Sequence, residues 1–79
     1  MADEIRAILD AHARLRAQAS ALSVGDDLYE AGMTSHASVN VMLALEGEFE
    51  IEFPDNMLKR SVFESIAAIG TAVSELRGS

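Results

Sequence analysis

Ser35 and His36 stand side by side, and a serine hydroxyl next to an imidazole is a pairing used in nucleophilic catalysis. Neighbouring residues on a helix point about 100° apart, however, so these two side chains cannot easily form a dyad. The only other histidine, His12, lies in a different predicted helix, where we expect it at the edge of the core. No segment shows the convergent titratable groups that hydrolysis or group transfer needs. We therefore expect no enzyme activity.

Metal binding is a second chemistry to consider, because the chain is rich in carboxylates. The acidic residues of segments 26–30 and 46–55 do not follow the spacing of a calcium-binding loop. Cysteine is absent, and two separate histidines do not make a zinc site. We interpret these carboxylates as solvated charge and predict no metal site.

The Ser35 hydroxyl could instead be a point of modification. Ser35 follows a glycine-containing segment and precedes an apolar run, a placement that suits the N-cap of a helix. The free N–H groups and the dipole at a helix start would stabilise a phosphodiester on such a serine. The local sequence leaves two interpretations open, a modified serine and an ordinary N-cap.

Helical segments must position this serine. Apolar spacing predicts a first helix over residues 3–18, followed by a long loop over residues 20–34 that keeps several apolar anchors. Loops of this length in compact domains are usually functional. A second helix is predicted to begin at Ser35, with Val39 and Leu43 on a flank away from its core face.

The second half of the chain predicts two further helical pieces. Residues 48–53 alternate acidic and apolar side chains, but with no partner strand we interpret them as a helix end and an extended loop. A short helical turn is predicted over residues 56–60. Ser61 and Glu64 match a capping box that would start the last helix, which runs over residues 62–76.

These segments predict an all-α fold, an up-and-down four-helix bundle with a long first loop and a short third helix. We expect a single domain over residues 1–79. Gly70, inside the last predicted helix, would mark a close approach of two helices. The predicted core contains Ile5, Ile8, Leu9, Leu15, Leu28, Val41, Met42, Leu45, Phe49, Ile51, Ile66, Ile69 and Val73.

Charge is distributed unevenly along the chain, which has a net charge of −7. Residues 26–55 contain eight acids and no Lys or Arg, whereas the remaining segments hold five acids and six bases. Such a field repels nucleic acid and anionic membranes and attracts basic protein surfaces, although it also serves solubility alone. The chain has no signal-peptide pattern and no apolar run of membrane-spanning length. We expect a cytoplasmic monomer that binds neither nucleic acid nor membrane.

Residues 32–55 resemble the modification segment of acyl and peptidyl carrier proteins. They contain a Gly-x-x-Ser sequence that ends at Ser35, an apolar helix, a Leu-Glu-x-x-Phe closing turn and an apolar–Pro pair. The preceding loop and the final helix agree with the family, so the resemblance spans nearly the whole chain. It implies that a phosphopantetheinyl transferase moves 4'-phosphopantetheine from coenzyme A onto Ser35. The thiol of this arm would then carry cargo as a thioester.

Two positions depart from the family pattern. Thr34 and His36 replace its usual Asp and Leu, and residues 35–45 contain no acid. In this respect the segment resembles a smaller bacterial group, the aminoacyl carrier proteins, which are loaded by ligases related to aminoacyl-tRNA synthetases. The residues predicted to recognise such a partner are Thr34, His36, Val39, Asn40, Leu43 and Glu46. The alternative for Val39 and Leu43 is an ordinary core position.

The resemblance thus implies a carrier that moves an aminoacyl or acyl thioester from a dedicated ligase to a downstream acceptor enzyme. Two alternatives stay open. One is an acyl carrier protein of fatty acid, polyketide or nonribosomal peptide synthesis. The other, from a different class, is an unmodified acidic helical module that binds a basic partner.

Overall fold

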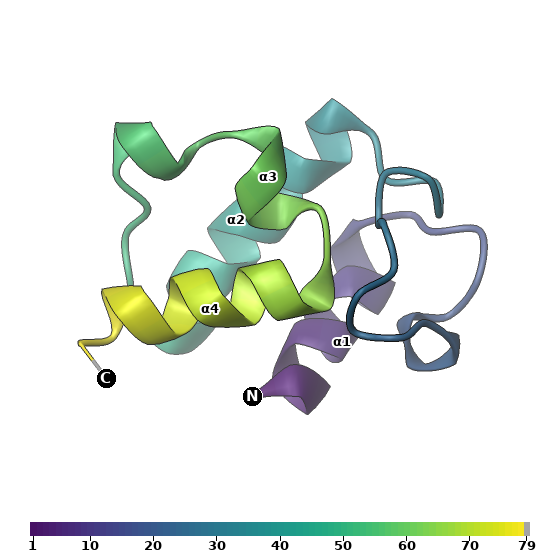
Figure 1. Ribbon diagram of the computed structural model, residues 1–79, viewed down its shortest axis with the longest axis horizontal. Helices are drawn as coiled ribbons and strands as arrows, with labels where there is room; N and C mark the ends of the chain where they lie inside the picture. The colour runs from purple at the N-terminus through teal and green to yellow at the C-terminus, as the bar shows by residue number, and fades with distance from the viewer. Residues whose placement is uncertain (79) are drawn as a thin grey trace.

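The computed structural model describes residues 1–78, which form helices and loops without a strand. The helices are α1 (Ala2–His12), α2 (Ser35–Phe49), α3 (Arg60–Phe63) and α4 (Ile66–Leu76), with 3-10 turns at Ala19–Ala21 and Asp55–Met57. α1 contacts both α2 and α4, and α3 contacts α4 (Figure 1). The predicted all-α bundle with a long first loop and a short third helix is confirmed. None of these helices combines the length and the apolar character needed to cross a membrane.

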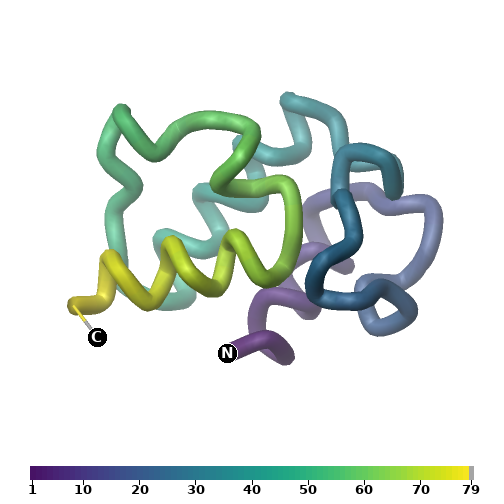
Figure 2. The backbone as a smooth tube through the Cα atoms, viewed as in Figure 1, coloured from purple at the N-terminus to yellow at the C-terminus, as the bar shows by residue number. Residues whose placement is uncertain are grey.

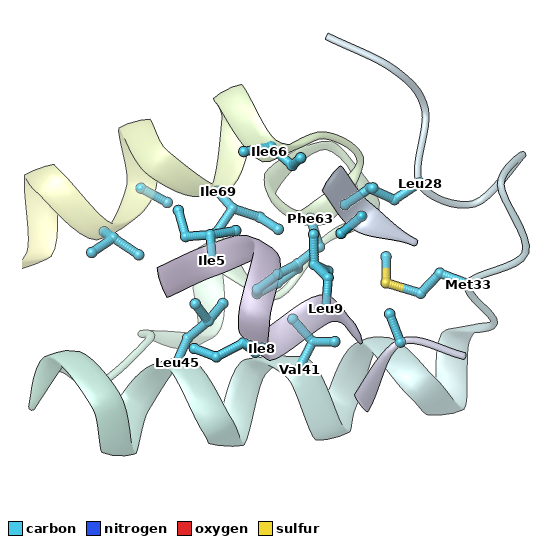
Figure 3. Close-up of a cluster of buried hydrophobic side chains, with 14 of the residues drawn as sticks. Ile5, Ile8, Leu9, Leu28, Met33, Val41, Leu45, Phe63, Ile66 and Ile69 are labelled. Atoms are coloured by element: carbon cyan, nitrogen blue, oxygen red, sulfur yellow. The ribbon is translucent and has the colours of Figure 1, made fainter. Parts of the chain in front are cut away.

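The core lies where α1 meets α2 and α4. Ile5 and Leu9 of α1 are buried among Val41 and Leu45 of α2 and Ile69 of α4 (Figure 3). Full burial of such a side chain contributes about 1.5–3 kcal/mol, so this junction supplies a large part of the stability. Four predicted core residues, Leu15, Met42, Phe49 and Ile51, are only half-buried at the edge. The prediction missed the buried Ala13, Ala19, Met33, Ala37, Phe53, Phe63 and Ala72.

The first helix is shorter than the predicted 3–18. It ends at His12, and Arg14 takes a left-handed conformation with φ 56°. The apolar spacing continued past this point because the loop folds back onto α1 and buries Ala19 there. The Asp10 carboxylate accepts the Ala19 N–H at 2.7 Å, which holds the returning loop. His12, expected at the core edge, is exposed.

The first loop, residues 13–34 (Figure 2), is therefore longer than predicted. Hydrogen bonds fix its path. The Leu28 N–H donates to the Glu64 carbonyl at 2.7 Å, and Val24 accepts the Ala67 N–H at 2.9 Å. The prediction that the acids of this loop are solvated charge is incomplete, because two of them accept backbone hydrogen bonds. Asp26 accepts the Ser23 N–H, and Asp27 accepts the N–H groups of Tyr29 and Glu30.

The predicted capping box of Ser61 and Glu64 is wrong. The chain forms α3 and then breaks, and Ser65 is the N-cap of α4, its hydroxyl accepting the Ala68 N–H at 3.0 Å. The first loop explains the break, because Leu28 and Val24 bond the backbone at residues 64 and 67. The capping-box pattern depends on residues 61–64 alone. The hydrogen bonds from the first loop override it. The predicted turn over 56–60 is likewise replaced by the 3-10 turn and the start of α3.

The stretch after α2 follows the prediction. α2 ends at Phe49, Glu50 is left-handed with φ 53°, and an extended segment leads to Pro54. Gly70 also lies where two helices meet, facing Ile5 of α1. A Cβ built there would lie 3.9 Å from the nearest atom, an ordinary contact, so the helices do not require a glycine.

Replacing Ser61 or Ser65 by alanine tests which of the two serines caps α4. Ser65→Ala removes the bond to the Ala68 N–H and should lower the free energy of unfolding by about 1 kcal/mol. Ser61→Ala, at an exposed position inside α3, should change it by less than about 0.5 kcal/mol. Urea denaturation followed by circular dichroism measures both. Equal losses for the two variants would contradict this assignment of the α4 cap.

Candidate functional site: an exposed serine at the start of α2

Thr34, and not Ser35, is the N-cap of α2. Its hydroxyl oxygen accepts the Ala37 N–H at 3.0 Å, and its backbone is extended. Ser35 is the first residue of the helix itself and is exposed. The prediction of Ser35 as the N-cap is therefore wrong by one residue. Because Thr34 does the capping, the Ser35 hydroxyl is left free for other chemistry.

The turn before Ser35 is closely held. Met33 is buried, and its N–H donates to the Leu28 carbonyl at 3.0 Å. Arg16 crosses the loop, its backbone N–H donating to Ala31 and its guanidinium to the Glu30 carbonyl, both at 2.9 Å. Gly32 has φ 121°, a conformation that other residues rarely adopt, and a Cβ there would lie 3.3 Å from the Arg16 backbone nitrogen. Ser35 thus follows a turn whose backbone is held by hydrogen bonds.

A cavity of about 410 Å³ opens beside Ser35, within the range of small-ligand pockets. α2 contributes Ser35, Ser38, Val39 and Met42 to its wall, and the opposite side consists of Leu58, Lys59, Arg60 and Phe63, with Tyr29 from the first loop. The second wall was not predicted. The sequence contains one indication of this wall, because Lys59 and Arg60 are the only Lys or Arg residues between residues 17 and 76.

An aromatic pair and a cation above a tyrosine ring shape this second wall. The rings of Phe53 and Phe63 lie 5.2 Å apart at 58°, which anchors α3 to the segment that follows α2. The Arg60 guanidinium lies over the Tyr29 ring, 4.0 Å from its centre. This contact joins α3 to the loop that leads into Ser35.

Four of the predicted recognition residues share one exposed strip of α2. His36, Val39, Asn40 and Leu43 follow helical spacing and are all exposed, Val39 by 50% and Leu43 by 55%. The core alternative for Val39 and Leu43 is therefore excluded. We call these four residues the α2 strip.

Thr34 and Glu46, the other two predicted recognition residues, have structural contacts. Thr34 caps α2, as described, and the half-buried Glu46 accepts the Phe53 N–H through its carboxylate at 2.9 Å. This bond ties the last turns of α2 to the extended segment. Recognition by either residue stays a prediction.

These residues are well suited to a phosphodiester-linked arm. Ser35 offers an exposed hydroxyl at the positive end of a helix, where the backbone favours negative charge. Lys59 and Arg60 border the same cavity, and no carboxylate among residues 1–78 lines it. Within that part of the chain no cluster of His, Asp or Glu is arranged to hold a metal ion.

The family described as "Phosphopantetheine attachment site" matches residues 3–73. The chain belongs to this family, whose members carry covalently attached 4'-phosphopantetheine. The resemblance found in the sequence is thereby confirmed.

Known carrier proteins are similar to the chain over most of its length. An "Aminoacyl carrier protein" of Agrobacterium fabrum is 46% identical over 69 residues, which covers 87% of this chain and 83% of the relative. A carrier protein from Agrobacterium tumefaciens, crystallised with an engineered Bradyrhizobium japonicum glycine:[carrier protein] ligase and AMP, has a TM-score of 0.91 and 44% identity over 94% of this chain and 99% of that one. The corresponding complex with ATP has a TM-score of 0.90 and 43% identity, covering 94% and 96%.

The cap at Thr34 can be separated from any role of Thr34 in recognition. Thr34→Ala should lower the free energy of unfolding by about 0.5–2 kcal/mol, because the Ala37 N–H loses its partner. Thr34→Asp keeps a capping oxygen and should stay within about 0.5 kcal/mol of the wild type. Thermal and urea denaturation of the three proteins measure the difference. An Asp variant as unstable as the Ala variant would contradict the capping role.

Proposed function

We propose that this protein is an aminoacyl carrier. Ser35 bears the phosphopantetheine arm, and an amino acid:carrier protein ligase loads an amino acid onto its thiol. The observation that carries the proposal is the exposed Ser35 hydroxyl at the start of α2, beside a cavity that no acid of residues 1–78 lines. The relatives crystallised with a glycine:[carrier protein] ligase support the same reading.

The chain's own contribution is presentation. When bound, the arm supplies the thiol that holds the cargo as a thioester. The protein keeps Ser35 on a fixed turn, stabilises the negative phosphodiester at the helix start and offers the α2 strip to partners. It supplies no catalytic group, so bond formation belongs to the transferase, the ligase and a downstream acceptor enzyme. We propose the cytoplasm as its location.

The α2 strip favours an aminoacyl carrier over a carrier of fatty acid synthesis. Residues 35–45 contain no acid, so a basic partner surface would find no charge to pair with there. Val39 and Leu43 offer apolar contact instead, flanked by the polar groups of His36 and Asn40. A small hydrophobic contact of this kind suits a partner that must dissociate after each transfer.

Modification is tested by intact mass. After incubation with coenzyme A and a phosphopantetheinyl transferase, the wild type should gain the mass of one arm. Ser35→Ala should gain nothing, because it lacks the accepting hydroxyl. Ser38→Ala is the matched control, since Ser38 lies one turn further on the same helix and its hydroxyl bonds the Ser35 carbonyl at 2.7 Å. A wild type that stays bare would favour the unmodified interaction module.

Loading by a glycine:[carrier protein] ligase tests the α2 strip. Val39→Ala and Leu43→Ala in the modified protein should each raise the KM for the carrier by roughly fivefold, equivalent to about 1 kcal/mol of lost apolar contact. Val24→Ala is the control, because Val24 is similarly exposed, at 47%, but lies in the first loop. Radiolabelled amino acid transfer gives the rates. Equal KM values for all four proteins would remove the strip from recognition.

A further inference from the structure

The opening part of the first loop differs in charge from the rest of this acidic chain. Residues 11–25 contain His12, Arg14 and Arg16 and no acid, whereas residues 26–55 contain eight acids and no Lys or Arg. All three side chains are exposed. Among residues 1–78, no Asp or Glu forms a salt bridge with either arginine. A chain with a net charge of −7 therefore presents two guanidinium groups that its own carboxylates do not neutralise.

Arg14 has a backbone conformation in which a side chain is costly. Its φ is 56°, in the left-handed region, and it lies two residues after His12, where α1 ends. Glycine is the usual residue at this place, because it has no Cβ to crowd the backbone. The guanidinium groups of Arg6 and Arg16 donate to loop carbonyls, but that of Arg14 has no hydrogen bond within residues 1–78. The contacts of the fold therefore do not explain an arginine at this position.

The two arginines lie against the turn that precedes Ser35. The Arg16 backbone N–H donates to the Ala31 carbonyl at 2.9 Å. A Cβ built on Gly32 would lie 3.3 Å from the Arg16 nitrogen and 3.5 Å from the Arg14 carbonyl oxygen. Gly32 is three residues before Ser35, so Arg14 and Arg16, which we call the loop arginines, lie close to the start of α2.

A hollow of about 420 Å³ opens beside the loop arginines. Its lining includes Arg14, Arg16 and Gln18, together with Asp10, whose carboxylate already accepts the Ala19 N–H at 2.7 Å. A guanidinium group binds carboxylates well, because its N–H donors match the two carboxylate oxygens in one plane. The hollow therefore offers donors to a carboxylate side chain that a partner inserts.

The charge of the whole chain limits which anion can bind here. Nucleic acid or an anionic membrane is an extended negative surface, which the eight acids of residues 26–55 would repel. A folded protein that presents a few carboxylates in one place avoids most of this repulsion. The neighbouring segment of α2, residues 35–45, contains no acid, so it does not oppose such a partner either.

We propose that the loop arginines bind carboxylates on the amino acid:carrier protein ligase, and so extend its contact from the α2 strip onto the first loop. This inference rests on the proposed function. Exposed ion pairs of this kind steer and orient a partner without binding it tightly. The left-handed arginine is then retained because it contributes to docking, although glycine would suit the backbone better.

Loading of the modified protein by a glycine:[carrier protein] ligase tests the contact. Arg14→Gln and Arg14→Gly should each raise the KM for the carrier by roughly two- to fivefold at low salt, as expected for an exposed ion pair, and leave kcat unchanged. Arg77→Gln is the matched control. It changes the net charge equally, but Arg77 lies over the ring of Phe49, at the other end of α2.

Salt separates this contact from the apolar one of the α2 strip. Added salt should bring the KM values of the wild type and the Arg14 variants together, because the lost contact is electrostatic. The ratio of KM values between Leu43→Ala and the wild type should persist in salt, because Leu43 loses apolar contact.

Urea denaturation distinguishes docking from a structural role of Arg14. Arg14→Gly should unfold at the same urea concentration as the wild type or a higher one, because glycine adopts the left-handed conformation without strain. A lower midpoint for this variant would show that the fold itself needs the arginine, and would overturn the inference.

Three kinetic results would also overturn the ligase contact. The first is a KM for both Arg14 variants equal to that of the wild type. The second is an equal rise in Arg77→Gln, which would reduce the effect to net charge. The third is slower modification by the phosphopantetheinyl transferase with an unchanged ligase KM, which would assign the loop arginines to the transferase.

The wild type separates this inference from the proposed function. A wild type that the ligase loads supports the aminoacyl carrier whatever the Arg14 variants do, so unchanged variants then remove the arginine contact alone. A wild type that accepts the arm but is never loaded overturns both.

Discussion

The hydrogen bond from the Ala37 N–H to the Thr34 hydroxyl is the contact on which the site depends. A helix start needs an oxygen acceptor, and a serine that provided it would have its hydroxyl engaged. Placing the cap one residue earlier satisfies the helix and leaves Ser35 exposed on its first turn. The same helix start favours negative charge, so the residue that is free to react is also the one where a phosphodiester is best accommodated.

The rest of the fold keeps this helix start in position. α1 is buried against α2 and α4, and the first loop is bonded to the backbone at the junction of α3 and α4. That junction brings Lys59, Arg60 and Phe63 to the side of the cavity opposite Ser35. A loop that would be a flexible connection in isolation therefore has a defined path, and it connects the start of α2 to the junction of α3 and α4.

Much of this could be predicted from the sequence where local spacing and packing agree. The apolar face of α2, the exposure of Val39 and Leu43 and the end of α2 before Pro54 all follow from patterns within a few residues. Two of the errors fall where contacts between distant segments decide the structure. Ala19 extended the apparent period of α1 because the loop returns to it, and Glu64 was taken for a capping residue although its carbonyl bonds Leu28. The cavity wall from α3 could not be predicted, because it depends on which segments the fold brings together.

The family places a phosphopantetheine arm on this chain, and among the hydroxyls near the start of α2 we propose that of Ser35 as its attachment point. Thr34 is engaged in the cap, and Ser38 donates to the Ser35 carbonyl. The most direct test is tandem mass spectrometry of peptides spanning residues 34–38 from protein isolated from its native cell. The account predicts the phosphopantetheine mass on Ser35. The same mass on Thr34 or Ser38, or unmodified peptide throughout, would contradict it.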